Sequence, residues 1–508
     1  MSMAFQRIHQ CFDERVAQDP SFPFLLLPGA PMTMGELSVC VDSLEAELRQ
    51  LGVRQGDRVL VVAENCPEHV ALVLACSRVG AWACGVNARM TAAEIAGFMH
   101  KADARLIYFT TAVSSAARDH AKREASQASV LPGLQRSAVY AHAMAEQGAL
   151  AERVAAVIFT SGTTGQPKGV LVSHEGLLQF GRVSAESRDL TPRDRSYAYL
   201  PMTHIFGLGT ILMASLHAGA GLLMRSQFDP ADVFDALANQ GMTQLQGPPA
   251  MFTRLLAWLD TQGIEGPVAP DLRYVYTGAA PLDMSVKHAV EQRFGQPLHH
   301  GYGLSEYAGA LTLCRKDVWR DDTSAGYLVE GAELRIVDAQ GLDVPQGETG
   351  EIWMRGVGLM PGYFRDADIT ASVMKPGGWY ASGDLGRQDA DGALLVVGRL
   401  KEMIIRSGFN VYPGEVEAVL LAYPGVHRAA VAGRKVADGN EEICAFIEPR
   451  PGASIKLDAL HAHVQEKLAP YKRPSVFQLV NEMPMTHSGK VLKRELLLQL
   501  TPSTSSAH

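Results

Sequence analysis

The chain lacks the features of a secreted, membrane-anchored or nucleic-acid-binding protein. Its 508 residues contain seven scattered cysteines and no CxxC pair: Cys11, Cys40, Cys66, Cys76, Cys84, Cys314 and Cys444. An odd, dispersed set fits a reducing cytoplasm better than a disulfide framework. The net charge is −8 and no basic block occurs, which argues against nucleic acid or an anionic membrane as the main partner. The start, Met1–Arg7, has no signal-peptide order of basic then apolar residues.

One long uncharged stretch needs a separate explanation. Ser196–Met224 contains no Asp, Glu, Lys or Arg, which is long enough to suggest a membrane span. Pro201, His204, His217 and several glycines interrupt it. We therefore expect a loop, a buried helix and a strand beneath a substrate pocket, with no stable membrane insertion.

The most informative segment is a run of glycines, hydroxyls and one lysine directly after the apolar stretch Val154–Phe159. It reads Thr160-Ser161-Gly162-Thr163-Thr164-Gly165-Gln166-Pro167-Lys168-Gly169. A backbone that wraps phosphate oxygens needs glycine for tight turns, inward N–H and hydroxyl donors, and a mobile cation. An ordinary polar turn seldom carries so many donors. A Walker A loop is excluded by spacing, because Lys168 stands between Pro and Gly instead of preceding Ser or Thr.

Alternation of short apolar runs with helical stretches predicts the architecture. Strands are expected at 58–63, 106–110, 154–160 and 273–277, with a helix from Pro67 to Val79, so we expect parallel sheets covered by helices. Strand-like runs at 332–337 and 350–355 flank a turn and predict antiparallel structure. Beyond about residue 400, helices at 413–421 and 457–468 with strands at 428–431 and 443–447 predict a small α+β domain.

Further segments carry side chains suited to nucleotide chemistry. Tyr302-Gly303-Leu304-Ser305-Glu306 offers an aromatic face for a base, a close backbone approach, a hydroxyl for phosphate and a carboxylate for Mg²⁺. A strand end with a buried tyrosine is an equal alternative for this pentapeptide alone. Small residues that admit a flat ring occur at Gly278, Ala279 and Ala280, and a carboxylate follows a glycine at Asp384. Near the C-terminus, Lys490 ends a Thr-x-Ser-Gly-Lys run; alone it would be read as solvated surface.

Together these segments resemble the adenylate-forming (AMP-binding) superfamily, in its acyl-CoA synthetase branch of fatty-acid and aryl-acid CoA ligases. The matches extend from residue 160 to 490. The resemblance implies an α/β fold with a large N-terminal domain (1–399) that includes a β-barrel-like part. It also implies a mobile α+β C-terminal domain (402–500) hinged at Lys401; the tail 501–508 is expected to be frayed.

The resemblance also implies roles for single residues. Lys490 is the catalytic lysine, with Ser305 and Glu306 as further catalytic residues and Glu306 as the Mg²⁺ ligand. The nucleotide is expected to bind at the phosphate loop, the adenine turn, the 302–303 segment and the ribose pair, that is at Thr160, Ser161, Gly162, Thr163, Thr164, Gly165, Lys168, Gly278, Ala279, Ala280, Tyr302, Gly303, Asp384 and Arg399. Coenzyme A is expected near Gly408, Arg406 and Lys472, although either cation could simply be solvated.

The implied reaction joins a carboxylic acid to CoA with ATP and Mg²⁺, through an acyl-adenylate, releasing pyrophosphate and then AMP. Transfer to a carrier protein and a non-catalytic nucleotide-binding relative stay open as alternatives, as does a luciferase-like oxygenase. An NAD-dependent dehydrogenase is disfavoured because no GxGxxG opens a βαβ unit. The resemblance and the composition predict a cytoplasmic enzyme, and a homodimer is left open.

The acyl pocket is the least determined part. We expect it between residues 204–216, the 277–281 turn and 307–310, with His204, His300 and Gly309 in its wall. A buried, hydrogen-bonded histidine is an equal interpretation of His204. Because the expected lining is small and mostly apolar, the sequence favours a medium-chain or aromatic acid.

Overall fold

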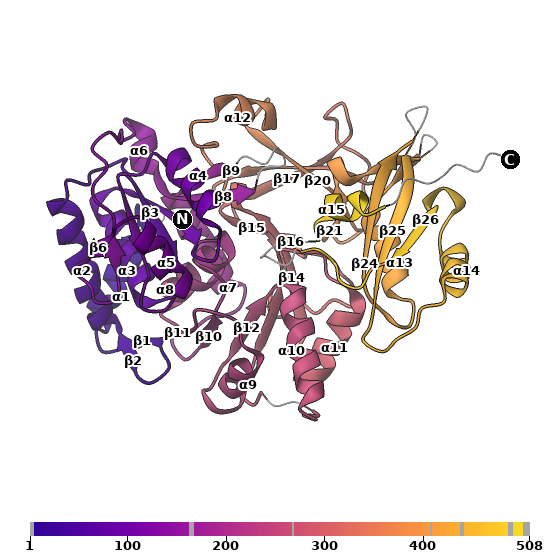
Figure 1. The fold of residues 1–508 in the computed structure, drawn as a ribbon, viewed down its shortest axis with the longest axis horizontal. Helices are drawn as coiled ribbons and strands as arrows, with labels where there is room; N and C mark the ends of the chain where they lie inside the picture. The colour runs from indigo at the N-terminus through magenta and orange to yellow at the C-terminus, as the bar shows by residue number, and fades with distance from the viewer. Residues whose placement is uncertain are drawn as a thin grey trace. The chain divides into compact units, whose positions relative to one another are not determined.

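The computed structural model describes residues 5–161, 167–266, 269–406, 409–436, 441–485 and 491–500. These residues divide into two compact units, whose course Figure 1 traces by colour. The first unit takes the chain up to Ala279, His288–Leu334 and Met354–Tyr380. The second takes Ala280–Lys287, Arg335–Trp353 and the chain from Ala381 on. The boundary between the two units does not fall at Lys401, so the domains 1–399 and 402–500 and the hinge at Lys401 stay predictions. Residues 501–508 lie outside the described residues.

The strand and helix expected after residue 58 are confirmed. Strand β3 (Arg58–Ala63) is buried along its whole length and pairs in parallel with β4 and β5, as predicted for a central strand of a covered sheet. Helix α3 begins at Pro67, where the missing N–H costs no hydrogen bond, and ends at Val79. Gly80 follows with φ +78°, in the left-handed region that terminates a helix and favours glycine.

A seven-stranded sheet in the first unit carries the phosphate-loop run. Its order is β6-β7-β5-β3-β4-β8-β9, with parallel pairing from β5 to β8 and antiparallel strands at both edges. The remaining strands are β4 (Trp82–Asn87), β5 (Leu106–Phe109), β6 (Gln127–Ala128), β7 (Gln135–Arg136), β8 (Val154–Ser161) and β9 (Pro167–Ser173).

A nine-stranded sheet, also in the first unit, has the order β16-β15-β14-β13-β12-β10-β11-β1-β2. Strands β10 to β14 and β1 run in parallel, and β2, β15 and β16 pair antiparallel at the edges. The strands are β1 (Pro23–Leu26), β2 (Pro31–Thr33), β10 (Arg195–Ala198), β11 (Gly221–Met224), β12 (Gln244–Gly247), β13 (Tyr274–Thr277), β14 (Leu298–Leu304), β15 (Gly309–Leu313) and β16 (Tyr327–Leu328).

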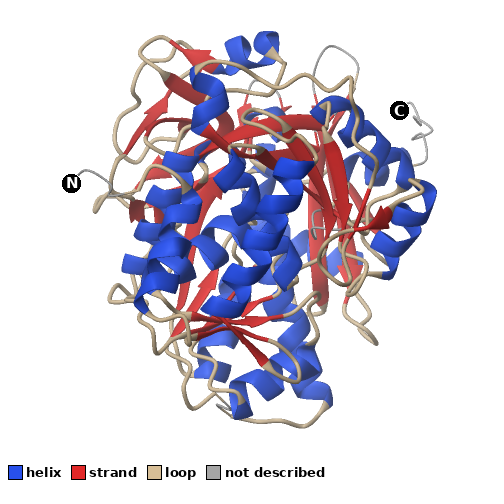
Figure 2. Cartoon of the chain, turned by 90° about the vertical axis from the view of Figure 1, so that its left-hand side faces the viewer, coloured by secondary structure: helices blue, strands red, loops and turns tan. Residues whose placement is uncertain are grey.

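Helices cover these two sheets, and Figure 2 shows them packed against the strands. Helix α3 contacts β3 and β4 of the seven-stranded sheet, while α7 contacts β8 and β9 of that sheet and β15 of the other. The helices before residue 300 are α1 (Ile8–Gln18), α2 (Met34–Gln50), α4 (Ala92–Ala102), α5 (Ser115–Arg123), α6 (Ala149–Arg153), α7 (His174–Glu186), α8 (Ala214–Ala218), α9 (Pro230–Asn239), α10 (Pro249–Thr261) and α11 (Met284–Phe294).

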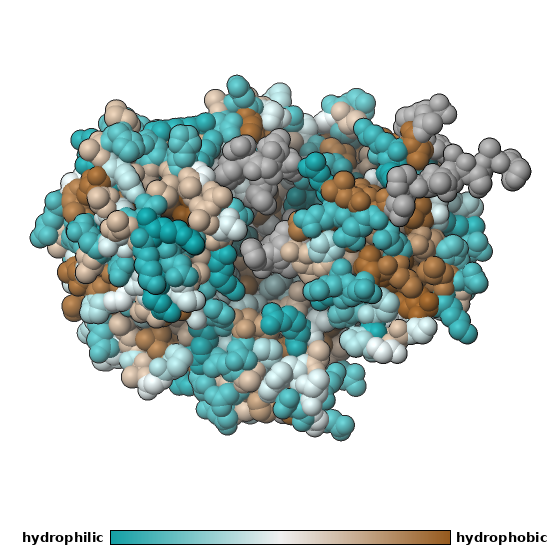
Figure 3. All heavy atoms as spheres, viewed as in Figure 1, coloured by the Kyte–Doolittle hydropathy of each residue, from teal (hydrophilic) through white to brown (hydrophobic). Residues whose placement is uncertain are grey.

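The uncharged stretch after Ser196 contains the expected loop, buried helix and strand, and it begins with a further strand, β10, that was not predicted. Between β10 and β11 it forms a π-helical segment, η1 (Phe206–Met213), in which every residue is buried, followed by α8. A Cβ at Gly207 would lie 2.3 Å from the carbonyl oxygen of Pro201, so this turn can approach the preceding loop only with glycine. No described helix has both the length and the hydropathy needed to cross a membrane. On the face in Figure 3, hydrophobic side chains form small groups among polar ones.

Smaller sheets make up the remaining β-structure of the described residues. A five-stranded sheet runs β17 (Ala332–Val337), β18 (Gly350–Gly356), β20 (Trp379–Gln388) and β19 (Met374–Lys375), with β21 (Leu394–Arg399) also on β20. The C-terminal block has the pair β22 (Ile404–Arg406) and β23 (Phe409–Val411), and the sheet β24 (Val426–Lys435), β25 (Glu441–Pro449) and β26 (Val476–Leu479). Its helices are α13 (Pro413–Leu421), α14 (Leu457–Lys467) and α15 (Lys493–Leu498), and α12 is Ala367–Val373. The strands and helices predicted here are confirmed.

Candidate active site

The phosphate-loop run lies at the tip of the β8–β9 hairpin. In the register of this hairpin, Thr160 is opposite Lys168, and Ser161 is opposite Pro167. The predicted ligands Gly162, Thr163, Thr164 and Gly165 lie outside the described residues. The hairpin therefore brings the first hydroxyl and the lysine of the run to the same position along the sheet, on either side of the loop.

Lys168 contacts an aromatic residue from a distant segment. Its Nζ lies 5.1 Å from the centroid of the Tyr363 ring, within cation–π range. The chain around Tyr363 runs antiparallel to β9, because Phe364 N donates to Gly169 O (2.7 Å) and Val170 forms a bridge with Tyr363. Backbone pairing thus fixes the ring beside the lysine.

The same tyrosine reaches the predicted Mg²⁺ ligand. Glu306 lies in a short 3-10 turn after β14, and its Oε1 accepts a hydrogen bond of 2.9 Å from Tyr363 Oη. Tyr380 Oη lies 3.3 Å from Tyr363 Oη. Burial, reinforced by the charge of Glu306, raises the pKa of Tyr363 above its ordinary range, so the phenol stays protonated and can donate. Lys168, Tyr363 and Glu306 thus form one connected cluster within the first unit.

A single carboxylate in this cluster fits Mg²⁺ chemistry. In proteins this ion is commonly held by one or two carboxylates together with substrate phosphates. Within the described ranges, no three His, Cys, Asp or Glu side chains gather as a self-sufficient metal centre. Glu306, joined to Lys168 through Tyr363, is consistent with an ion that arrives with the nucleotide.

Gly303 makes a close backbone approach within the protein itself. A Cβ there would lie 2.2 Å from the backbone oxygen of Gly309, so glycine lets β14 lie against β15. Ser305 is buried, and Tyr302 is half-buried in β14 itself. The approach thus serves strand packing, and nucleotide contacts of Tyr302, Gly303 and Ser305 stay predictions.

The predicted adenine turn follows β13. Gly278 and Ala279 come directly after the buried Thr277, and Ala279 is exposed with φ +65°, an uncommon conformation for a residue other than glycine. A role of Gly278, Ala279 and the half-buried Ala280 against the base stays a prediction.

The predicted ribose carboxylate is held in the second unit by its own strand and a neighbouring cation. Gly383 has φ +71°, and its N–H donates to Glu351 Oε1 (3.0 Å), which sets the turn before Asp384. Asp384 Oδ1 lies 3.0 Å from Arg399 Nε, and the two residues are register partners across β20 and β21. Sequence reasoning placed both at the ribose, and the structure brings them together.

In the C-terminal block, the predicted CoA cations already have partners. Arg406 donates to the carbonyl of Arg473, and Lys472 forms an ion pair with Glu415, which raises the pKa of Lys472. Phe409, the register partner of Arg406, stacks on Tyr471 with ring centroids 4.5 Å apart, and Lys472 Nζ lies 5.8 Å from the centroid of the Tyr471 ring. Each cation is therefore next to one member of an aromatic pair. Gly408 and Lys490 lie outside the described residues.

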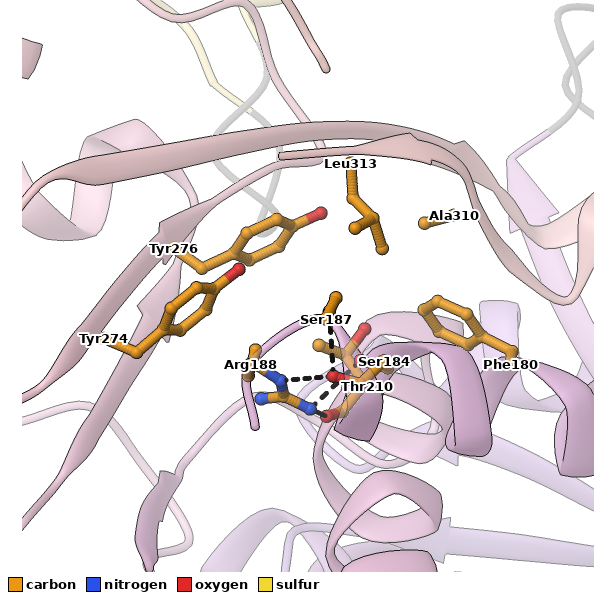
Figure 4. A pocket seen from close by; sticks show the side chains of 9 residues that line it. All are labelled: Phe180, Ser184, Ser187, Arg188, Thr210, Tyr274, Tyr276, Ala310 and Leu313. Atoms are coloured by element: carbon orange, nitrogen blue, oxygen red, sulfur yellow. Dashed lines mark hydrogen bonds between the residues drawn. The ribbon is translucent and has the colours of Figure 1, made fainter. Parts of the chain in front are cut away.

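A cavity opens between η1, α7 and the nine-stranded sheet (Figure 4). The helical side contributes Phe180, Ser184, Ser187, Arg188 and Thr210. The strand side contributes Tyr274, Tyr276, Ala310 and Leu313. Thr210 and Ala310 belong to the expected segments, whereas the other seven residues were not anticipated, and the lining is more polar than expected.

The three predicted pocket residues have different positions. Gly309 borders the cavity, because a Cβ there would lie 2.2 Å from the ring of the lining residue Phe180. His300 is nearly buried, with Nδ1 3.1 Å from Thr323 O, and does not line this cavity. His204 is exposed, so its interpretation as a buried histidine is wrong; its Nδ1 accepts from the N–H of Phe206.

Comparison with known proteins shows to which family this chain belongs. Residues 12–364 match the family described as AMP-binding enzyme, and residues 415–490 match the AMP-binding enzyme C-terminal domain. The chain belongs to the AMP-binding enzyme family. It is 33% identical over 474 residues to feruloyl-CoA synthase from Amycolatopsis sp, covering 92% of this chain and 94% of that protein. It is 32% identical over 500 residues to sulfoacetate–CoA ligase from Cupriavidus necator, covering 95% and 96%.

The solved structures agree with this assignment. ATP-bound MatB from Rhodopseudomonas palustris superposes with a TM-score of 0.85 at 28% identity, covering 96% of this chain and 98% of that one. The resemblance drawn from the phosphate-loop run and the later segments is therefore confirmed, as is the mixed α/β fold.

Two residues of this AMP-binding enzyme were missed by sequence reasoning. Tyr363, in Pro361-Gly362-Tyr363, had a weak signal in its Pro-Gly turn, but its partners come from residues far away in the chain. Arg188 follows α7, where a charged residue is normally taken as surface, yet it is only 2% exposed. Only the tertiary structure identifies either one.

Proposed function

We propose that this protein is an AMP-forming acid–CoA ligase, which activates a carboxylic acid with ATP and transfers the acyl group to CoA. The observation that carries the proposal is the Lys168–Tyr363–Glu306 cluster beside the phosphate hairpin. It supports the proposal because it gathers a cation and a predicted Mg²⁺ ligand beside the hairpin that we expect to hold the phosphates. The main barrier to the approach of an anionic carboxylate to an anionic phosphate is electrostatic, and a lysine together with a carboxylate-held Mg²⁺ would lower it.

In the first half-reaction, the carboxylate oxygen attacks the α-phosphorus of ATP, and pyrophosphate leaves. Thr160 and Lys168 hold the departing phosphates, Glu306 holds Mg²⁺, and Lys490 stabilises the charge that develops at the reacting atoms. Bound Mg²⁺ supplies Lewis-acid neutralisation of the phosphate oxygens. Asp384, kept in place by Arg399, accepts hydrogen bonds from the ribose hydroxyls.

In the second half-reaction, the CoA thiol attacks the acyl carbonyl, and AMP leaves. We propose that rotation at Lys401 exchanges Lys490 for the surface around Gly408, Arg406 and Lys472. Lys472 would then exchange Glu415 for a CoA phosphate. The relatives' names include an aromatic acid and sulfoacetate, so they support CoA as acceptor without fixing the acid. The homodimer and the cytoplasmic location stay predictions, which light scattering and cell fractionation would test.

The direct test of the first half-reaction is acid-dependent exchange of labelled pyrophosphate into ATP. We expect exchange with at least one acid of a broad panel, dependent on Mg²⁺ and independent of CoA. Exchange that requires CoA, or none with any acid, would contradict the proposal.

Replacement of Tyr363 by phenylalanine tests the cluster. Tyr363→Phe removes the hydroxyl that donates to Glu306 and keeps the ring beside Lys168. We expect the rate of adenylate formation to fall about tenfold to a hundredfold, the usual value of a hydrogen bond to a charged group, and the apparent KM for Mg²⁺ to rise. The measurement is pyrophosphate release at varied Mg²⁺.

A matched control comes from a second tyrosine–glutamate pair. Tyr140 Oη donates to Glu124 Oε2 at 3.0 Å, remote from the cluster along the chain, so Tyr140→Phe should leave Mg²⁺ dependence unchanged. An equal shift of the KM for Mg²⁺ in both variants would show that Tyr363 acts only on the fold.

Replacement of Asp384 tests the ribose site. Asp384→Ala removes the acceptor of the ribose hydroxyls, so we expect the apparent KM for ATP to rise about tenfold to a hundredfold while the KM for the acid changes little. Initial rates at varied ATP and acid measure both. The control is Asp343→Ala, which breaks an Arg335–Asp343 pair of 2.6 Å elsewhere in the second unit. An effect confined to the acid would show that the nucleotide is misplaced.

A further inference from the structure

Lys493 joins separate elements of the second unit through two carboxylates. It is the first residue of α15, and its Nζ lies 3.2 Å from Glu402 Oε2 and 2.8 Å from Glu417 Oε1. Glu402 lies in the short turn before β22, and Glu417 lies in α13. Glu417 Oε1 also accepts a hydrogen bond of 2.8 Å from the N–H of Val431 on β24. Lys493, Glu402 and Glu417 thus form an ion triad that holds the turn, two helices and a strand together.

The charges of the ion triad depend on the lysine. Burial alone would lower the pKa of Lys493, but the charges of Glu417 and Glu402 outweigh burial and raise this pKa, so the amine is charged at neutral pH. Burial alone would raise the pKa of Glu402, but the charge of Lys493 outweighs it and lowers this pKa. Both carboxylates face the same ammonium, so they would repel each other if the ammonium were removed. The lysine therefore keeps Glu402 next to α13 and α15.

The chain on either side of residues 486–490 is fixed just before the ion triad. Met485 and Val491 form an antiparallel bridge, and the N–H of Leu492 donates to the carbonyl of Pro484 (2.8 Å). Met485 and Val491 also pack against the same buried cluster to which α15 contributes a residue. The segment 486–490, which includes the predicted catalytic lysine, lies outside the described residues. Its two described ends are held together, and the second end leads directly into α15.

The other end of the ion triad is the chain just after Lys401. Glu402 is the next residue, and Ile404 belongs to the buried cluster that also contains Val416 and Leu420 of α13. Burial at Ile404 and the ion pair at Glu402 thus attach this part of the chain to the C-terminal block. One ion pair, between Glu402 and Lys493, therefore links the chain that follows the predicted hinge with the chain that follows the segment 486–490.

We propose that Lys493 is a positioning residue for acyl-adenylate formation, because it ties the base of the segment that carries Lys490 to the residue after Lys401. Rotation at Lys401 then moves both parts as one body, and Lys490 reaches the reacting atoms in a fixed geometry. Such fixation matters because a displacement of about 1 Å can cost about a hundredfold in rate. The inference rests on the proposed acid–CoA ligase function, in which Lys401 is the hinge and Lys490 is the catalytic lysine.

Lys493→Met tests the role of the ammonium. We expect single-turnover adenylate formation at saturating ATP, acid and Mg²⁺ to fall about tenfold to a hundredfold. The KM for ATP and the rate of thioester formation from preformed acyl-adenylate should change less than about twofold, because neither depends on Lys490. Glu402→Gln should give the same split between the half-reactions. Lys493→Arg keeps a cation with donors for two carboxylates, so it should retain most of the wild-type rate. The last two variants serve if Lys493→Met does not fold.

The sharpest measurement is the same substitution in the Lys490→Ala background. If Lys493 acts through Lys490, Lys493→Met should cause no further loss of adenylate formation there, because the effects of residues that act as a unit do not add. An equal loss in both half-reactions of Lys493→Met would mean that Lys493 only stabilises the fold. That result, or an undiminished further loss in the Lys490→Ala background, would overturn the inference and leave the ligase function standing.

Arg434→Met is the matched control. The side chains of Arg434 and Lys493 are both 24% exposed, and Arg434 pairs with its register partner Glu442 across β24 and β25 of the same block. Arg434→Met removes an equal charge and an ion pair of the block, and it should leave adenylate formation unchanged. A loss as large as that of Lys493→Met would contradict a specific role of the ion triad.

Hydrogen exchange separates the inference from the ligase function if no acid supports adenylate formation by the wild type. That result would contradict the ligase function with these acids. Lys493→Met should still speed amide exchange at least about tenfold in both 399–406 and 491–498, because loss of the shared ion pair frees both segments for local opening. Arg434→Met should not. Unchanged exchange in Lys493→Met, or faster exchange in only one of the two segments, would overturn the inference.

Discussion

Lys490→Ala is expected to reduce acyl-adenylate formation about 100- to 1,000-fold, the usual cost of removing one group that stabilises charge in a transition state. The same variant should convert preformed acyl-adenylate and CoA to thioester at the wild-type rate. The reason is that the lysine acts only while carboxylate and phosphate approach each other. Single-turnover measurements of each half-reaction give the two rates separately.

A surface lysine provides the control for this variant. Lys467 is half-exposed and, among the residues that the structure describes, its recorded ion pair is with its neighbour Glu466, so Lys467→Ala should leave both half-reactions unchanged. A loss of equal size in both half-reactions of Lys490→Ala would contradict the assignment of this lysine to adenylation.

Lys401→Pro is expected to give the opposite pattern. Lys401 lies in a short 3-10 turn (Leu400–Glu402), and the next residue, Glu402, pairs with Lys493 on α15 at 3.2 Å. The chain just after Lys401 is thus fastened to the C-terminal block. Proline fixes φ, so a rotation at this residue is blocked. We expect thioester formation to fall about a hundredfold or more, as for other misplaced reacting groups, while adenylate formation persists.

Lys401→Ala is the matched variant, because it removes the same side chain and keeps the backbone free. It should carry out both half-reactions. Normal turnover of Lys401→Pro with CoA would place the pivot at another residue, and loss of adenylate formation would indicate damage to the fold.

The elements that were predicted well are those set by local sequence. The run Arg58–Ala63 is apolar throughout and forms a buried parallel strand, and Pro67 and Gly80 mark the ends of α3. The phosphate hairpin was also evident, because its glycines and hydroxyls follow directly on a strand.

The parts that sequence did not reveal depend on distant pairing or on burial. Tyr363 joins Lys168 to Glu306 only because its segment lies along β9. Arg188 is charged and follows a helix, a pattern typical of solvated surface, and its burial comes from packing against η1 and β13. The contact of Gly303 with Gly309 comes from the pairing of β14 with β15, which the local sequence does not show.

Product analysis with ATP, Mg²⁺, CoA and a broad panel of acids tests most directly whether this chain is an acid–CoA ligase. We expect acyl-CoA, AMP and pyrophosphate in equal amounts for at least one acid, with no AMP released beyond the thioester formed. Adenylate that accumulates unchanged by CoA, and is discharged only by a separate carrier protein, would contradict it.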